Sequence, residues 1–164
     1  MRGKSILEIV EGFSLRLPKF PDGRIDYSLS DVAPIVTVFV RYRDKILLLK
    51  RSDKVGTYRG KWNTVAGYLD DAKPVREKAL EELREEIGVR EEDISSMRFG
   101  EMLEFQDERI GRTWIVNPVL VELKKKPEIK LDWEHIEYKW IKPDELKNFD
   151  VTFNLDKSLH ALLK

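Results

Sequence analysis

Apolar residues along the chain gather into short β-rich runs, and charged residues separate these runs. Residues 34–42 (PIVTVFVRY) and 45–51 (KILLLKR) are divided only by Arg43 and Asp44, which predicts a β-hairpin. Later runs have the same character and predict further strands: 62–69, 97–106, 113–123 and a short run that ends at Trp140.

The longest helical pattern covers roughly residues 74–87. Pro74 suits the first helical position, and Gly88 suits the left-handed residue that closes a helix. Apolar residues at three- and four-residue spacing form a stripe that can dock onto a sheet: Val75, Ala79, Leu80, Leu83 and Ile87. Shorter helices are expected from Pro143 onward and at 154–163. This order of strands and helices predicts an α/β fold with a mixed sheet between helical layers.

Three glutamates on this helix, Glu82, Glu85 and Glu86, lie on an arc beside the apolar stripe. Glu82 and Glu86 are one turn apart, and like charges at that spacing repel by about 0.2–0.5 kcal/mol per pair in an isolated helix. A hard divalent cation with oxygen ligands would remove this cost, so the cluster predicts a metal site. The alternative is a solvated acidic face, in which Lys78 partly neutralises Glu82 from four residues upstream.

Composition narrows the classes of function. The 164 residues suffice for one domain with a substantial core. Thirty basic and thirty acidic residues give a formal net charge of zero, so we expect neither nucleic acid nor a membrane as partner. Cysteine is absent from the sequence, which excludes disulfides, thiolate metal sites and cysteine nucleophiles. The sequence shows neither a long apolar run nor a signal-peptide core, so the expected location is cytoplasmic.

Residues 67–89 (GYLDDAKPVREKALEELREEIGV) resemble the Nudix box, a pattern of glycine, glutamate and aliphatic residues at fixed spacing. The matching positions are Gly67, Glu82, Leu83, Glu85, Glu86, Gly88 and Val89. Upstream, 61–70 is similar to the strand that feeds the box in the Nudix hydrolase family. Downstream, 136–146 is similar to the family's last strand and the start of its closing helix. The resemblance covers about residues 34–163, nearly the whole chain apart from an N-terminal arm.

Two positions depart from the box, and they depart together. Lys73 stands where the family has its first glutamate, and Glu81 stands where it has arginine. In the family these two residues look like an ion pair that supports the turn before the helix, and exchanging their charges could keep the pair. We therefore hypothesise that Lys73 and Glu81 contact each other. The alternative is a decayed box in a domain that binds a ligand without catalysis.

The resemblance implies an α/β/α sandwich with a mixed β-sheet over residues 34–164. It also implies Mg²⁺-dependent hydrolysis of a diphosphate linkage in a nucleoside diphosphate derivative, with Mn²⁺ as the alternative ion. By this resemblance the catalytic and metal-binding carboxylates are Glu82, Glu85 and Glu86. The proton from water would go to one of these or to a carboxylate from another segment: Glu101, Glu104, Glu134 or Glu137.

Cationic residues near the box are candidates for substrate binding. We expect Arg51, Arg59 and Lys61, together with Gly67, to form the substrate side of the site. Arginine can bind a phosphate through two parallel hydrogen bonds, which suits a diphosphate. Solvated loop charges are the alternative interpretation of the three cations. The substrate itself is expected to be a small nucleotide or a nucleotide sugar, and its identity would depend on loops at 52–60 and 107–112.

Aromatic residues and the two histidines receive separate predictions. Three aromatic residues are candidates for stacking on a base: Tyr58, Phe105 and Trp114. Trp62 and Trp140 are expected in the core. His135 and His160 are far apart in the pattern, so they indicate no metal pair, and we expect them at a helix end or on the surface.

The first 33 residues are interpreted as a short β-rich arm that packs on the domain at 34–164. Within the arm, ILEIV and FSLRL could pair as a hairpin, and LPKFPDG indicates a loop. The arm could add strands to the sheet, cover the substrate or mediate a homodimer, and simple packing at the edge is favoured. For the chain as a whole, the box and its two departing positions leave two competing functions. One is a Nudix hydrolase, and the other is a Nudix domain that binds a nucleotide ligand as a sensor or regulatory module.

Overall fold

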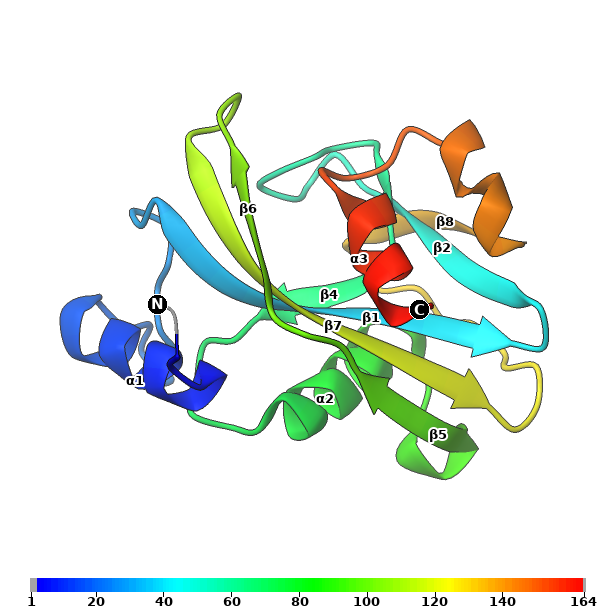
Figure 1. Ribbon diagram of the computed structural model, residues 1–164, viewed down its shortest axis with the longest axis horizontal. Coiled ribbons are helices and arrows are strands. Elements are labelled where there is room, and N and C mark those ends of the chain that lie inside the picture. The colour runs from blue at the N-terminus through cyan, green and yellow to red at the C-terminus, as the bar shows by residue number, and fades with distance from the viewer. Residues whose placement is uncertain (1–2, 164) are drawn as a thin grey trace.

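The computed structural model describes residues 3–163, and a mixed β-sheet organises them (Figure 1). Its long central strands are β1 (Val32–Tyr42) and β7 (Arg112–Leu123), which run parallel to each other. The other strands in these residues pair in antiparallel fashion: β2 (Lys45–Arg51), β3 (Trp62–Asn63), β4 (Val65–Tyr68), β5 (Ile94–Phe99), β6 (Leu103–Asp107) and β8 (His135–Ile141). β2 and β4 pair with β1, β5 and β6 pair with β7, and β3 and β8 pair with β2.

Side chains of β1 alternate between the two faces of the sheet and serve two apolar cores. Val36, Val38 and Val40 belong to a core that includes α1 (Ile6–Arg16) and α2 (Val75–Ile87). Phe39 belongs to a second core that includes α3 (Leu155–Leu162) and the 3₁₀ helix η2 (Pro143–Asn148). A further 3₁₀ helix, η1 (Glu91–Asp93), connects α2 to β5. Helices therefore cover both faces of the sheet (Figure 1), which confirms the predicted α/β/α sandwich.

Two of the predicted strands are each divided in the structure. The run 62–69 forms β3, which pairs with β2, and then β4, which pairs with β1. The run 97–106 forms β5 and β6 because Pro118 of β7 has no N–H to offer to a continuous ladder. Gly100 lies beside this proline between the two strands, and its N–H donates to the Pro118 carbonyl at 2.9 Å. A Cβ atom at Gly100 would lie only 2.9 Å from the proline ring. Hydrophobic periodicity carries no signal for either break.

The N-terminal arm begins with a helix, so the prediction of a β-rich arm with a hairpin is wrong. Ile9, Val10 and Phe13 recur at helical spacing in α1, and all three are buried in the core shared with α2. The Ser5 hydroxyl caps the helix by accepting a hydrogen bond from the Glu8 N–H at 3.2 Å. This Ser-x-x-Glu start was the local signal for a helix, and it outweighs the β propensity of the apolar residues.

The remainder of the arm lies against the turn that precedes α2. The Tyr27 hydroxyl donates a hydrogen bond to the Leu69 carbonyl at 2.7 Å, and the Ile25 N–H donates to the Asp70 carbonyl at 2.8 Å. The Tyr27 ring also stacks on Tyr68, with ring centroids 5.6 Å apart. These contacts place residues 25–27 of the arm next to the strand that leads into α2.

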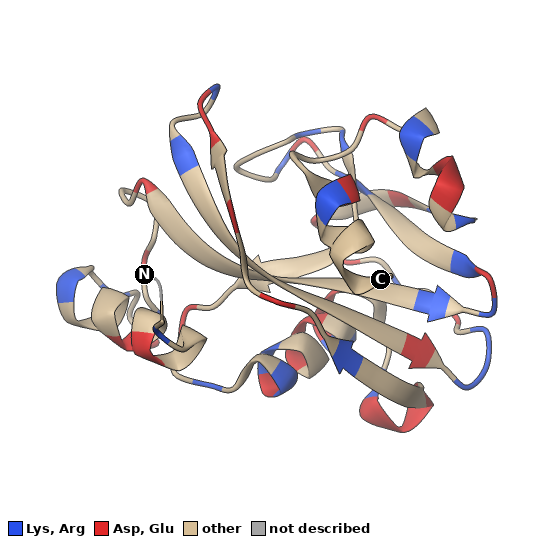
Figure 2. Ribbon diagram, viewed as in Figure 1, with Lys and Arg blue, Asp and Glu red and all other residues tan. Residues whose placement is uncertain are grey.

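α2 confirms the helix expected at about 74–87. It begins at Val75 after Pro74 and ends where Gly88 adopts a left-handed φ of 75°. Acidic and basic residues are interspersed over the fold (Figure 2), in agreement with the balanced composition. Within residues 3–163, no helix has the length and apolarity needed to cross a membrane. A cytoplasmic location and a homodimer stay predictions.

Candidate active site

Three groups with metal-ligand chemistry converge beside the last turns of α2. One atom each from Glu86, Glu134 and His135 lies within 4.8 Å of the other two. The side chains of Glu86 and His135 are 2% and 1% exposed, and His135 Nε2 lies 3.7 Å from Glu86 Oε1. Within the described part of the chain, Glu86 Oε2 and His135 Nε2 have no hydrogen-bond partner. Unpaired buried polar atoms are rare, so this grouping is a candidate cation site.

Backbone hydrogen bonds hold the loop before β8 against the end of α2. The Lys130 N–H donates to the Ile87 carbonyl at 3.1 Å, and the Asp132 N–H donates to the Glu86 carbonyl at 3.3 Å. The last carbonyls of a helix have no partner within the helix, and this loop satisfies two of them. The same contacts bring two ligand groups from the loop to Glu86.

Glu82 packs against β4 at a position where only glycine leaves room. A Cβ atom at Gly67 would lie 2.5 Å from both Cδ and Oε1 of Glu82. The N–H of the adjacent Ala66 donates to Glu86 Oε1 at 3.5 Å. The lack of a side chain at Gly67 therefore leaves room for the Glu82 carboxylate beside the backbone of β4.

Burial dominates the electrostatics of these carboxylates. It raises the pKa of Glu82 to about 7, and it raises the pKa of Glu86 well above its usual range. Burial also raises the pKa of Glu134. Glu85 is exposed on the same helix, and its negative charge adds to the rise at Glu82 and Glu134. A bound cation would reverse this trend by favouring the ionised forms.

A pocket of about 150 Å³ adjoins the carboxylates and includes both Gly67 and Glu134 in its wall. Aromatic side chains supply much of the remaining wall: Tyr58, Tyr68, Phe105, Trp114 and Phe153. The Tyr58 hydroxyl donates to Asp107 Oδ2 at 2.8 Å and accepts from Trp114 Nε1 at 2.9 Å, which fixes both rings. Tyr58, Phe105 and Trp114, the residues expected to stack on a base, thus lie together. An aromatic pocket beside buried carboxylates can accept a planar group with an anionic tail.

The family model described as NUDIX domain matches residues 32–162. The chain belongs to the NUDIX family. The match spans the whole sheet together with α2 and α3, whereas α1 lies before it. The resemblance based on the box is thereby confirmed.

This NUDIX protein is similar to other proteins in sequence or in structure, at low sequence identity. The nucleoside triphosphatase NudI of Escherichia coli O139:H28 is 24% identical over 130 residues, which cover 76% of this chain and 92% of NudI. A Caenorhabditis elegans Ap4A hydrolase has a TM-score of 0.65 at 17% identity, over 80% of this chain and 95% of that one. An E. coli dihydroneopterin triphosphate pyrophosphohydrolase has a TM-score of 0.66 at 16% identity, over 80% and 96%. These structural similarities establish the fold.

The two positions that depart from the NUDIX pattern contact each other. Lys73 Nζ lies 3.3 Å from Glu81 Oε2, as hypothesised from the exchanged charges. Lys73 also lies 3.5 Å from Asp71, and both partners are partly exposed. The turn before α2 therefore retains an ion pair although each residue differs from the family pattern.

Restoring the family residues at both positions together should cost less stability than restoring either alone. Lys73→Glu places a third acidic group beside Asp71 and Glu81, and Glu81→Arg places a cation beside Lys73. Because the pair is partly exposed, we expect a coupling of about 0.5 kcal/mol in a double-mutant cycle measured by urea unfolding. Additive effects of the two substitutions would show that the contact has no energetic role.

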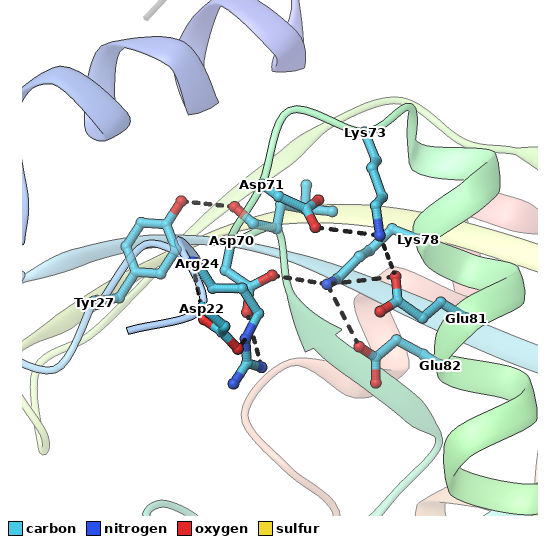
Figure 3. Close-up of polar contacts among 10 residues, drawn as sticks. Asp22, Arg24, Tyr27, Asp70, Asp71, Lys73, Lys78, Glu81 and Glu82 are labelled. Carbon is cyan, nitrogen blue, oxygen red and sulfur yellow. Dashed lines mark hydrogen bonds and ion pairs between the residues drawn. The ribbon is translucent and has the colours of Figure 1, made fainter. Parts of the chain in front are cut away.

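Lys78 lies at the centre of a buried ionic network that joins the arm, the turn and α2 (Figure 3). Its side chain is only 3% exposed, and its Nζ lies 2.7 Å from Asp70, 3.8 Å from Glu81 and 4.0 Å from Glu82. Burial alone lowers the pKa of Lys78, but the hydrogen bond to Asp70 and nearby carboxylates outweigh it and raise the pKa. Lys78 is thus a charged lysine inside the NUDIX domain, and it contacts Glu82 as the helical spacing indicated.

The structure separates the three cations predicted to bind substrate. Arg51 is half-buried, lines the pocket and donates from Nε to the Thr57 carbonyl at 3.0 Å. Arg59 is exposed and donates from Nε to the Val55 carbonyl at 2.7 Å. Lys61 forms an ion pair with Asp150 at 2.8 Å. Only Arg51 among these three cations lies in the pocket wall together with Gly67.

Among the four candidate bases outside the box, only Glu134 joins the carboxylate group in the described residues. Glu101, Glu104 and Glu137 are exposed and absent from the pocket wall. His160 is exposed in the last turn of α3, as expected. The surface or helix-end position expected for His135 is wrong, because the contact between its loop and α2 buries it. Sequence spacing carried no signal for this long-range contact.

Gly67→Ala should reduce hydrolysis while leaving the fold intact. The new methyl group displaces the end of the flexible Glu82 side chain, so stability should change by less than about 1 kcal/mol. A misplaced carboxylate should lower kcat by about 10–100-fold. Gly12→Ala is a control because a Cβ there meets no atom within 4 Å. Equal kcat for wild type and Gly67→Ala would contradict the packing argument.

The metal-free protein should lose stability as pH rises from about 4.5 to about 7. The folded state keeps a proton on Glu82, whose pKa is about 7 against an ordinary 4.5, while the unfolded state releases it. The resulting loss in the free energy of unfolding reaches about 3 kcal/mol near pH 7 and disappears below the ordinary pKa. Burial lowers the pKa of His135, so below pH 6.5 this histidine makes stability rise with pH, opposite to the effect of Glu82. The Glu82→Gln variant retains the histidine and therefore serves as the reference. Urea unfolding in EDTA should show a wild-type deficit that grows with pH, and parallel profiles would contradict it.

Proposed function

We propose that this NUDIX protein hydrolyses a diphosphate linkage in a nucleoside diphosphate derivative and that Mg²⁺ is its cofactor. The observation that carries the proposal is that the Glu82 and Glu86 carboxylates lie beside an aromatic pocket. Gly67, which is next to Glu82, and Glu134, which is next to Glu86, both form part of the pocket wall. The relatives described above are named as a nucleoside triphosphatase, an Ap4A hydrolase and a pyrophosphohydrolase. Each of these names denotes hydrolysis of a phosphate-bearing substrate, in agreement with the proposal.

The residues present fit a divalent cation. Glu86 Oε2 is buried without a partner, and the carboxylates of Glu82, Glu85 and Glu86 project from neighbouring turns of one helix. Carboxylate oxygens are the ligands that Mg²⁺ prefers, so these three residues would hold the ion. When bound, the cation neutralises the diphosphate and lowers the pKa of a bound water.

The remaining roles belong to side chains of the chain itself. Arg51 extends from β2 into the pocket wall, where its guanidinium can donate to a phosphate oxygen. Glu82, held against Gly67, accepts the proton of the attacking water. Trp114, Tyr58 and Phe105 exclude water from the pocket and pack on the nucleoside.

A sensor without catalysis is the second candidate. It was motivated by the departures at Lys73 and Glu81, but these two residues form an ion pair and leave the three box glutamates in place. A domain that had lost catalysis would have no need to bury Glu86 at an energetic cost. Hydrolysis is therefore the better supported function.

The test is turnover of a panel of nucleoside diphosphate derivatives with Mg²⁺, read by chromatography of the products. The panel should contain sugar nucleotides, dinucleoside polyphosphates and nucleoside triphosphates. Glu85→Gln and Glu86→Gln are the paired variants, and Glu77→Gln, exposed on the same helix, is the control. Turnover that both paired variants lose supports the hydrolase. Tight nucleotide binding without turnover on any compound would favour the sensor.

A further inference from the structure

Two buried side chains that approach each other in the site, Glu86 and His135, each have one atom without a hydrogen-bond partner among the described residues. His135 Nε2 lies 3.7 Å from Glu86 Oε1, and neither this nitrogen nor Glu86 Oε2 has a hydrogen-bond partner within residues 3–163. Leaving a buried polar atom unpaired costs about 1–3 kcal/mol. A direct hydrogen bond does not account for the pair because the separation is too long.

The other ring nitrogen of His135 fixes the orientation and tautomer of the imidazole. Nδ1 lies 3.1 Å from Asp132 Oδ1, and this carboxylate also accepts the Glu134 N–H at 3.2 Å. With its proton on Nδ1, the ring presents the Nε2 lone pair to Glu86. Metal-binding histidines commonly donate their second nitrogen to a carboxylate in this way.

Charge and spacing both favour a cation between these groups. Glu86 and Glu134 each offer a carboxylate oxygen within 4.8 Å of the His135 ligand atom, and Asp132 contacts the other ring nitrogen of His135. Ligands bound to one ion at about 2.0–2.2 Å are roughly 3–4 Å apart, which agrees with the 3.7 Å separation.

We propose that His135 Nε2, Glu86 and Glu134 form a mixed nitrogen–oxygen site that binds Mn²⁺ or Co²⁺ in preference to Mg²⁺. An imidazole ligand favours transition ions over Mg²⁺, which prefers oxygen ligands. Asp132 is a positioning residue, since it acts on the cation only through His135. The proposal refines the metal requirement of the proposed function, and direct metal binding tests it apart from activity.

Pulsed electron paramagnetic resonance of the Mn²⁺-loaded protein provides the direct test. The sequence contains two histidines, so modulation from a coordinated imidazole nitrogen should be present in wild type and in His160→Gln and absent in His135→Gln. Calorimetric titration should show Mn²⁺ affinity reduced about 10–100-fold in His135→Gln, with Mg²⁺ affinity changed less than about threefold. Asp132→Asn should keep the nitrogen signal and bind Mn²⁺ about tenfold more weakly.

Two results would overturn the proposal. One is the lack of imidazole modulation in Mn²⁺-loaded wild type, which needs no variant to fold. The other is equal loss of Mn²⁺ and Mg²⁺ affinity in Asp132→Asn, which would indicate a purely structural role for the His135 loop. Turnover of a nucleotide with Mg²⁺ in either case would leave the proposed hydrolysis standing, whereas Mn²⁺ binding through His135 without turnover would contradict hydrolysis alone.

Discussion

Glu86→Gln is expected to lower kcat by about 10³-fold while it stabilises the metal-free protein. The carboxylate is buried beside Glu82 and Glu134, and burial raises its pKa well above the usual range. Removing one essential carboxylate from a hydrolytic site commonly costs two to four orders of magnitude in rate, hence the estimate of about 10³. The neutral amide has nearly the same shape and relieves repulsion, so metal-free stability should rise by about 1–3 kcal/mol at neutral pH.

The measurement combines initial rates on the best substrate with urea unfolding in EDTA. Glu77→Gln on the exposed side of α2 should change neither quantity appreciably. With the divalent ion added, the order of stability should reverse, because only the wild type gains strongly from binding. A Glu86→Gln protein that is less stable than wild type without metal would contradict the account of a buried carboxyl group whose ionised form is unfavourable.

Lys78→Met should produce the largest loss of stability, about 3–5 kcal/mol. The substitution removes a buried cation and leaves the Asp70 carboxylate, 2.7 Å away, without its main partner. Arg24 lies 3.6 Å from Asp70 and can offset part of the loss (Figure 3). The positive charge of Lys78 also lowers the pKa of Glu82, so its removal should shift the pH dependence of kcat to higher pH.

The control is Lys73→Met on the exposed side of the same turn, which should cost less than about 1 kcal/mol. Lys78→Met combined with Asp70→Asn should recover much of the lost stability, because no unpaired charge then remains buried. Thermal and urea unfolding of wild type, Lys73→Met, Lys78→Met, Asp70→Asn and the double variant measure these differences. Full additivity of the Lys78 and Asp70 substitutions would show that the buried ion pair is not what the lysine provides.

The box and its helix were predictable because their signals are local. The spacing of Glu82 and Glu86, the proline before the helix and Gly88 after it are all encoded within a few turns of chain. The same holds for the apolar alternation of β1 and β2. Signals of this kind arise from the backbone geometry of a single helix or strand and from its one buried face. The spacing of apolar residues along the sequence therefore reveals them.

Two parts of the molecule show where local signals are insufficient. In the arm, apolar residues with β propensity form α1, and besides the local Ser5 cap the helix depends on burial in the core that it shares with α2. In the strand predicted at 97–106, the break depends on Pro118, a residue of a neighbouring strand. Each outcome depends on a partner that is distant in the chain.

The sequence by itself determined the family, the sandwich and the helix that carries the glutamates, because spacing and periodicity encode them locally. Only the tertiary structure decided which other groups meet those glutamates. The loop before β8 docks on α2 and brings Glu134 and His135 to Glu86, and it leaves Lys61 with Asp150 at the surface. Such contacts join segments that are 40 or more residues apart in the chain. Local spacing and periodicity do not show which of these distant segments pack together.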